Sequence, residues 1–132
     1  MQIQIDFRSG HPIYTQIVEQ VRGMIAAGEL HTGDQLPTVR QLATELRVNF
    51  NTVARAYRLL DEAGLISTQH GRGTYVWEAP TEEVDRRLRR QVLEDMTHKF
   101  LTDLHRLGYA ADEAIEVLEQ QIEAEQVKGD LS

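Results

Sequence analysis

Two helix starts lie only eleven residues apart in the middle of this 132-residue chain, and this spacing constrains the fold more than any other feature. Thr38 and Gln41 form a capping box, in which each side chain satisfies a backbone donor of the other residue. Asn49 is a favoured N-cap for a further helix. The helix between the two caps is about two turns long. A short helix, a tight turn and a third helix are typical of a helix-turn-helix.

The segment before this motif predicts one more helix and a strand. Residues 13–25 carry an apolar stripe at spacings of three and four, which predicts a helix with one buried face. Gly28 is a suitable stop for that helix. Residues 2–7 alternate between polar and apolar side chains, which predicts a short, half-buried strand.

The segment after the third helix predicts a β hairpin. Gly64 ends the helical pattern, and residues 65–69 and 74–77 have the composition of strands. Residues 70–73, His-Gly-Arg-Gly, form a glycine-rich turn between them. Three helices followed by a two-stranded hairpin are the order of a winged helix-turn-helix.

Charge divides the chain into two parts. Residues 1–77 carry seven arginines and seven acids, whereas residues 78–132 hold the whole net charge of −7. This asymmetry predicts two domains with these boundaries, 1–77 and 78–132. The absence of cysteine excludes a disulfide framework, a thiolate zinc site and a cysteine nucleophile. The chain has neither a membrane-spanning apolar run nor a basic leader, so we expect a soluble, cytoplasmic protein.

The second part has the pattern of two helices, each with one apolar stripe. Two such helices bury little surface alone, so we expect them to pair with those of a second copy in a four-helix arrangement. The alternative is that they fold back on the chain's own first domain. The residues expected at the dimer interface are Val84, Leu88, Val92, Met96, Phe100, Leu104, Ile115, Leu118 and Ile122. The predicted fold is mainly α with a small β hairpin: a winged helix-turn-helix, then a two-helix antiparallel dimerisation domain.

Several linked motifs resemble those of GntR-type bacterial transcription regulators. They are LPTVRQLA at residues 36–43, VNFNTVARAY at 48–57, EAGLI at 62–66 and GRGTYV at 71–76. PIYTQI at 12–17 and the short two-helix second part are similar to the YtrA-type branch of that family. The resemblance covers residues 1–77 closely and residues 78–122 by length and pattern.

The resemblance implies a dimeric winged-helix DNA binder, usually a repressor, which in this branch often acts beside genes for an ATP-driven transporter. It implies that Arg40 contacts the DNA backbone. It further implies that the third helix reads the major groove and that the wing reaches the minor groove. The residues that map to these two roles are Asn49, Asn51, Thr52 and Arg55 on the helix and His70, Gly71 and Arg72 on the wing. Other branches carry arginines at the positions of Phe50 and Ala54, so their operator sequences do not transfer to this chain.

The chemistry of these residue types suits the implied roles. Asparagine can pair with adenine and arginine with guanine, and arginines near helix ends bind phosphates. Thr38, Arg40 and Arg58 complete the set expected to contact DNA. Each position also has a plainer interpretation. Asn49 could serve only as a cap and Arg55 only as a solvated residue, the other arginines could form surface salt bridges, and the wing could be an ordinary turn.

Two other function classes compete with a DNA-binding regulator. A protein-interaction module built on a winged helix would not need arginines at groove-facing positions. An enzyme is not expected, because the chain has no phosphate loop, nucleophile motif or metal cluster. His98 and His105 lie two turns apart on one helix, about 10 Å, which is too far to share one metal ion. We therefore expect no cofactor and no metal, and the sequence names no small-molecule effector.

Overall fold

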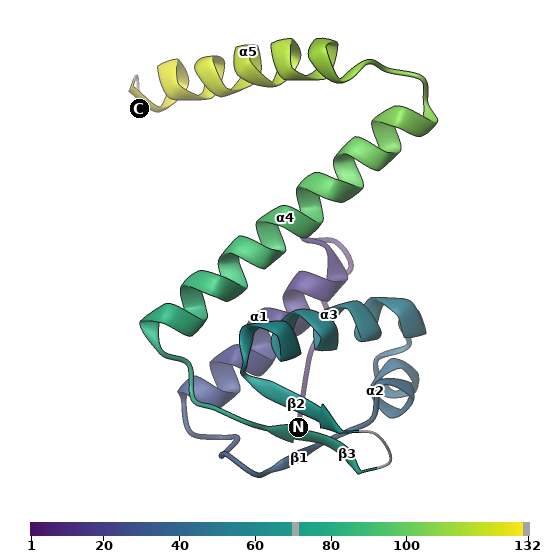
Figure 1. The fold of residues 1–132 in the computed structure, drawn as a ribbon, viewed down its shortest axis with the longest axis vertical. Coiled ribbons are helices and arrows are strands. Elements are labelled where there is room, and N and C mark those ends of the chain that lie inside the picture. Colours follow the sequence, from purple (N-terminus) through teal and green to yellow (C-terminus); the bar gives the residue numbers. More distant parts are fainter. Residues whose placement is uncertain (70–71, 131–132) are drawn as a thin grey trace. The chain divides into compact units, whose positions relative to one another are not determined.

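The computed structural model describes residues 1–69 and 72–130 of the chain. Contacts divide it into two compact units, Met1–Val92 and Leu93–Ser132. The elements are α1 (Ile13–Ala26), β1 (Gln35–Leu36), α2 (Val39–Leu46), α3 (Phe50–Ala63), β2 (Ile66–Gln69), β3 (Gly73–Val76), α4 (Glu82–Arg106) and α5 (Ala111–Asp130) (Figure 1). The mainly helical class and the winged helix predicted from the sequence are confirmed.

The helix boundaries of the first unit follow from its caps. The Thr38 Oγ1 accepts a hydrogen bond from the Gln41 amide at 3.0 Å, and the Gln41 side chain accepts one from the Thr38 amide at 2.9 Å. The C-cap of α2 is Arg47, which has a φ of 58° in the left-handed region. The N-cap of α3 is Asn49 and its C-cap is Gly64. The predicted short helix, tight turn and third helix are therefore all present.

The small sheet contains one strand more than the predicted hairpin. The antiparallel pair β2 and β3 forms that hairpin, and β1 pairs with the other edge of β3, with Leu36 opposite Thr74. Two residues are too few to show an alternating pattern, so β1 could not be recognised from the sequence. Gly73, at the start of β3, has a φ of 92°, which glycine adopts without strain.

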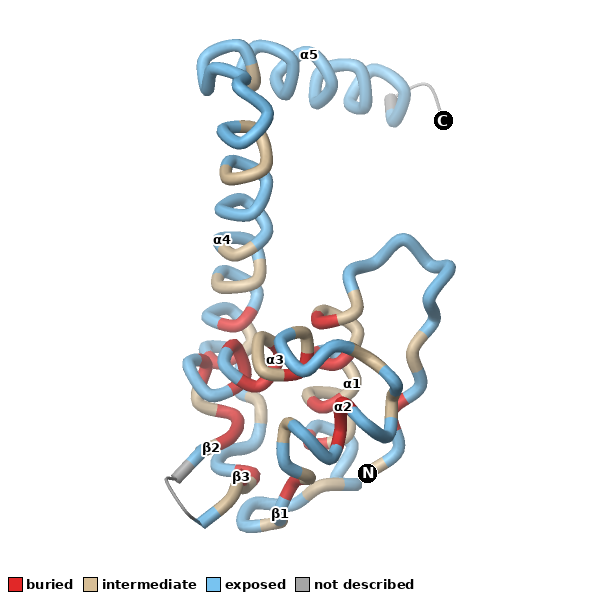
Figure 2. The backbone as a smooth tube through the Cα atoms, turned by 90° about the vertical axis from the view of Figure 1, so that its right-hand side faces the viewer, coloured by how far each residue is buried: buried red, intermediate tan, exposed pale blue. Residues whose placement is uncertain are grey.

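The core of the first unit lies between the three helices and the sheet. Its most buried large side chains include Ile17 of α1, Leu42 of α2, and Leu59 and Leu60 of α3, all 1 % exposed or less. Figure 2 shows the buried positions of this unit along α1, α2, α3 and the neighbouring strands. On α1, the buried residues Tyr14, Ile17, Val21 and Ile25 recur at spacings of three and four, as the apolar stripe predicts.

The N-terminal segment corrects one prediction, because residues 2–7 form no strand. Ile3 is buried against the core, but two glutamines of α1 satisfy the backbone of the segment where a neighbouring strand would do so. The Gln20 side chain accepts from the Gln4 amide and donates to the Gln4 carbonyl, at 3.0 and 2.7 Å. Gln16 makes the same pair of bonds to Asp6. The alternation of polar and apolar side chains in residues 2–7 therefore marks an N-terminal arm that is bound to α1, not a strand of the sheet.

The first turns of α4 correct the predicted interface. Val84 and Leu88 are 1 % and 3 % exposed and belong to the core of the first unit. Their apolar surface is already covered by their own chain, so it is not available to a second copy. Val92 is half-buried against the same core. The boundary between the two compact units accordingly lies after Val92, fifteen residues beyond Trp77, where the charge distribution predicts a domain boundary.

The second unit comprises the later turns of α4 and the whole of α5, and its apolar side chains are largely exposed. Met96, Phe100, Ile115, Leu118 and Ile122 are 44 to 56 % exposed, and Leu104 is half-buried. Within the part of the chain that the structure describes, no helix has the length and apolar character needed to span a membrane.

Candidate nucleic-acid interface

Arg40 lies in the first turn of α2, one residue after the helix starts, and its side chain is exposed. Its guanidinium carbon lies 5.8 Å from the ring centroid of Phe50, the first residue of α3. The neighbouring Thr38 is exposed, but its hydroxyl oxygen already accepts the capping hydrogen bond. Arg40 therefore presents a positive charge beside the start of α3, and Thr38 holds the helix end that carries it.

The start of α3 presents short polar side chains. The Asn49 Oδ1 accepts a hydrogen bond from the Asn51 amide at 2.7 Å, so the expected capping role of Asn49 is present. Its NH₂ group still carries two donors. Asn51 is exposed and Thr52 is half-buried. The first turn of α3 thus offers amide donors and acceptors of the kind that read base edges.

Tyr57 fixes the position of α3 relative to the start of α2. Its hydroxyl donates a hydrogen bond of 2.7 Å to the carbonyl oxygen of Pro37, directly before the α2 N-cap. The side chain is 3 % exposed, and burial raises the pKa of its hydroxyl well above the usual range. The hydroxyl therefore stays a donor at every physiological pH. It links the helix that carries Asn51 to the helix that carries Arg40.

Arg55 makes an aromatic contact that its expected role does not include. Its guanidinium carbon lies 3.9 Å from the centroid of the Tyr14 ring, and Tyr14 is 4 % exposed at the start of α1. A guanidinium stacked on an aromatic face is attracted by the ring quadrupole. Arg55 thus packs α3 on α1 rather than extending into solvent, and its role in reading the major groove stays a prediction.

Arg58 lies on an exposed part of α3 and has an acidic neighbour on the same helix. Its Nη1 lies 3.5 Å from the Glu62 Oε1, and both side chains are about half exposed. An exposed pair of this kind contributes little to stability, so it does not prevent Arg58 from contacting a phosphate. The structure therefore leaves the phosphate contact and the surface salt bridge both compatible with its position.

The wing is described only in part. Arg72 is exposed, and its backbone carbonyl accepts a hydrogen bond from the Tyr75 hydroxyl, which anchors the turn on β3. His70 and Gly71, the other two residues expected at the wing tip, lie outside the described residues.

Phe50 is a candidate that sequence reasoning missed. It is the first residue of α3 and its ring is 48 % exposed, between Arg40 and the polar side chains of the first turn. It lines a surface hollow together with Arg40, Ala43, Thr44 and Val48. An exposed aromatic at this position suits apolar contact with a thymine methyl group. The available signal was a large apolar side chain outside the stripe that faces the core.

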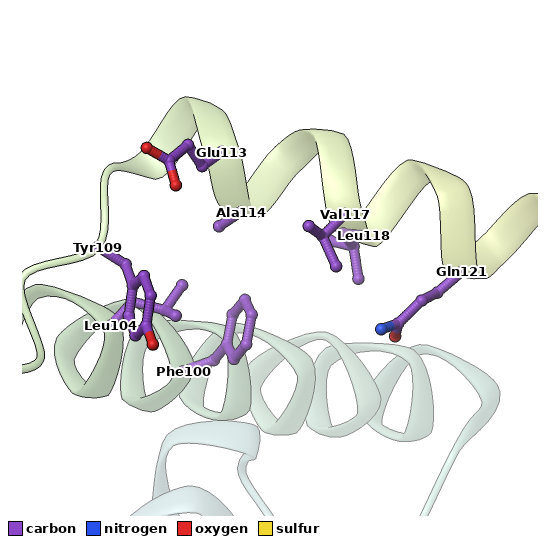
Figure 3. A pocket seen from close by; sticks show the side chains of 8 residues that line it. All are labelled: Phe100, Leu104, Tyr109, Glu113, Ala114, Val117, Leu118 and Gln121. Carbon is purple, nitrogen blue, oxygen red and sulfur yellow. The ribbon is translucent and has the colours of Figure 1, made fainter.

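The second unit contains an apolar pocket of about 360 Å³ between the end of α4 and α5. Figure 3 shows the Phe100 ring pointing from α4 toward Val117 and Leu118 of α5. The remaining lining residues are Leu104, Tyr109, Glu113, Ala114 and Gln121. Among the described residues, no three His, Cys, Asp or Glu side chains gather as a metal site would require.

A short capped α2, a tight turn, an α3 with a polar exposed start and a β2–β3 wing define a winged helix-turn-helix DNA-binding protein. Comparison with known protein families identifies the family to which this DNA-binding protein belongs. The model described as "Bacterial regulatory proteins, gntR family" matches residues 13–76. Together with the similarity to YtrA of Bacillus subtilis given below, this match shows that the chain belongs to the GntR family of transcriptional regulators.

Three known proteins illustrate the similarity. The HTH-type transcriptional repressor YtrA of Bacillus subtilis is 41 % identical over 107 residues, which cover 80 % of this chain and 81 % of YtrA. YtrA from Sulfolobus acidocaldarius, a GntR-family transcription factor of known structure, is 32 % identical with a TM-score of 0.54, covering 92 % of this chain and 97 % of its own. The DNA-binding domain of AraR in complex with operator ORX1 is 25 % identical with a TM-score of 0.52, covering 58 % and 98 %. These proteins are regulators rather than enzymes, in agreement with the prediction from the sequence.

Proposed function

We propose that this chain is a transcriptional repressor that binds a two-fold-symmetric operator as a homodimer. The observation that carries the proposal is the exposed, polar start of α3, which has Arg40 on one side and is held in place by Tyr57. Asn49 and Asn51 supply amides that read base edges, with Thr52 beside them, and Phe50 supplies an apolar contact. Arg40, Arg58 and Arg72 supply phosphate or minor-groove contacts.

Two of the similar proteins support the choice of a repressor that binds operator DNA. YtrA of Bacillus subtilis is named as a transcriptional repressor, and the AraR domain is seen with its operator. We extend both properties to this chain. The promoter of neighbouring transporter genes, expected from the resemblance to the YtrA-type branch, is a second DNA to test after the one upstream of the chain's own gene.

The exposed apolar side chains of the second unit support the homodimer. Phe100, Leu118 and Ile122 are each almost half exposed, and a monomer leaves them in water. A contiguous apolar face of this kind marks an interaction surface. Pairing two copies through α4 and α5 covers both faces with one symmetric contact.

The charge distribution supports DNA as the partner of the first unit only. Residues 1–92 carry eleven arginines and eleven acids, whereas residues 93–132 carry three basic residues and ten acids, a net charge of −7. The division after Val92 thus separates the charges as well as the contacts. Repulsion from DNA favours an orientation in which the second unit faces away from the duplex.

A gel-shift assay on the DNA upstream of the chain's own gene tests the proposal. We expect binding to this DNA at moderate salt and at least tenfold weaker binding to a scrambled duplex of equal length. Equal binding to both duplexes would contradict sequence-specific regulation and would favour a protein-interaction module.

Replacing Asn51 by alanine should relax the choice of operator. The variant loses a side chain that can pair with a base edge, which should weaken cognate binding by about 1–3 kcal/mol and leave scrambled DNA unaffected. Fluorescence anisotropy with both duplexes measures the ratio of the two affinities. Thr32→Ala, at an exposed position in the turn before β1, is the control and should keep the wild-type ratio. An unchanged ratio in the Asn51 variant would exclude this residue from base reading.

Replacing Arg40 by alanine should weaken binding to all duplexes alike. Loss of one phosphate contact should reduce the slope of log K against log salt concentration by about one. The slope is obtained from DNA-binding affinities measured at salt concentrations from about 50 to about 200 mM. Arg8→Ala, at an exposed position in the turn before α1, is the charge-matched control and should leave the slope unchanged. A sequence-dependent loss in the Arg40 variant would assign this residue to base reading instead.

A further inference from the structure

A two-point ion pair joins α1 to α4. The Arg22 Nε lies 2.7 Å from the Asp85 Oδ1, and its Nη2 lies 2.9 Å from the Asp85 Oδ2. The two residues are 63 positions apart in the chain, and their side chains are 31 % and 29 % exposed. Two parallel hydrogen bonds between a guanidinium and a carboxylate fix the relative orientation of the two groups as well as their distance. We call this pair the α1–α4 clamp.

The clamp lies where α4 begins. The Val84 amide donates a 3.1 Å hydrogen bond to the Thr81 Oγ1, so the start of the helix is itself capped. Val84 and Leu88, one position before and three after Asp85, are buried in the core of the first unit. Apolar burial is non-directional and permits rotation and sliding. The clamp adds the directional contact that the apolar pair lacks.

Two further ion pairs of α4 lack this property. Glu82 with Arg86 and Lys99 with Asp103 each join residues four positions apart on the same helix, so they cannot hold it to a neighbour. Hydrogen bonds from Arg22 hold the pKa of Asp85 below its usual value, so the clamp is charged at neutral pH. Glu19 adds a second carboxylate 3.3 Å from the Arg22 Nη1 and supports the arginine from α1.

We propose that Arg22 and Asp85 determine which half-site spacing the dimer accepts. The inference rests on the proposed homodimer, in which the α4 helix of each copy runs from the winged-helix unit into the paired second units. Each base pair added between half-sites moves one of them by about 3.4 Å and rotates it by about 35°. A dimer therefore selects one spacing only if α4 cannot pivot on α1, and the clamp prevents that pivot. Both residues are positioning residues, since neither contacts DNA in this scheme.

The test compares operators that differ only in spacing. Duplexes carry the two half-sites at the native spacing or with one base pair removed, one added or two added, and a further duplex carries a single half-site. The proteins are the wild type, Asp85→Asn, Arg22→Lys and the control Glu82→Gln. The control removes an acid from the same turn of α4 without touching α1. Arg22→Lys keeps the charge and loses the fork, so it separates orientation from attraction.

We expect the wild type and Glu82→Gln to lose about tenfold in affinity for each change of one base pair. Asp85→Asn and Arg22→Lys should bind neighbouring spacings within about threefold of each other and should lose about three- to tenfold at the native spacing, because a free pivot costs preorganisation. All four proteins should bind the single half-site equally, a result that a general loss of folding would not give.

Each contrary result is decisive. If Asp85→Asn and Arg22→Lys keep the wild-type spacing profile, the clamp does not set spacing and the inference is overturned. A broadened profile in Glu82→Gln would overturn it as well, by assigning the effect to the acids at the start of α4. If the wild type binds no operator at any spacing, the proposed function itself fails.

Discussion

Replacing Leu118 and Ile122 together by glutamate is expected to convert the dimer to a monomer and to weaken operator binding by about 10²–10⁴-fold. The two side chains lie four positions apart on α5 and are 46 % and 47 % exposed within one chain. Neither side chain belongs to the core of the first unit, so the change should leave the winged-helix unit of each copy folded. In the proposed dimer they are covered, and burying two unpaired carboxylates there is costly. In the dimer, binding of the first half-site brings the second subunit to a high effective concentration at the other half-site. A monomer loses this advantage.

Sedimentation and operator titration of the same samples measure this prediction. The control is Gln120→Glu with Ala124→Glu, which adds the same charge at the same spacing on α5. Both control positions are exposed, and each lies two residues, about 200° around the helix, from its counterpart. The control should remain dimeric with wild-type affinity. A dimeric Leu118 and Ile122 variant would show that this face of α5 is not the interface.

Replacing Leu88 by alanine should destabilise the winged-helix unit by about 2–5 kcal/mol. The sequence pattern places this leucine in the same stripe as the interface residues, but the structure buries it in the core of the first unit at 3 % exposure. The cost is the lost transfer free energy of the removed methyl and methylene groups and the cavity that they leave. The effect should therefore persist in a protein that cannot dimerise.

Urea denaturation in the monomeric background provided by the α5 double variant measures this effect. Leu107→Ala is the matched control, because Leu107 is 73 % exposed, and it should change the stability by less than about 0.5 kcal/mol. If Leu88→Ala leaves the denaturation midpoint of the monomer unchanged, Leu88 does not belong to the core of a single copy.

Local signals in the sequence predict the helices of the DNA-binding unit well. The capping box at Thr38, the N-cap at Asn49 and the stop at Gly64 each act within a few residues, and all are present in the structure. Signals that depend on distant partners predict less. The clamp between Arg22 and Asp85 spans 63 residues, and no local pattern marks either residue.

The candidate interface shows the same limit. Position along α3 predicts that Asn51 is exposed, because it lies outside the apolar stripe of that helix. It does not predict that Arg55 stacks on Tyr14, since the contact depends on how α1 crosses α3. The stripe on α4 is continuous in sequence but serves two partners: its first turns face the core of their own unit, and its later turns remain exposed. A periodic pattern identifies the apolar face of a helix and not what covers it.

The N-terminal arm has a consequence for solubility. An extended segment with unpaired backbone groups is a template on which another chain can add a strand, and proteins protect such edges to avoid aggregation. Gln4 and Asp6 are two residues apart, so their amides and carbonyls point to the same side of the arm. The side chains of Gln20 and Gln16 occupy both pairs of groups. Two side-chain amides thus close an edge that would otherwise be open to strand addition by another chain.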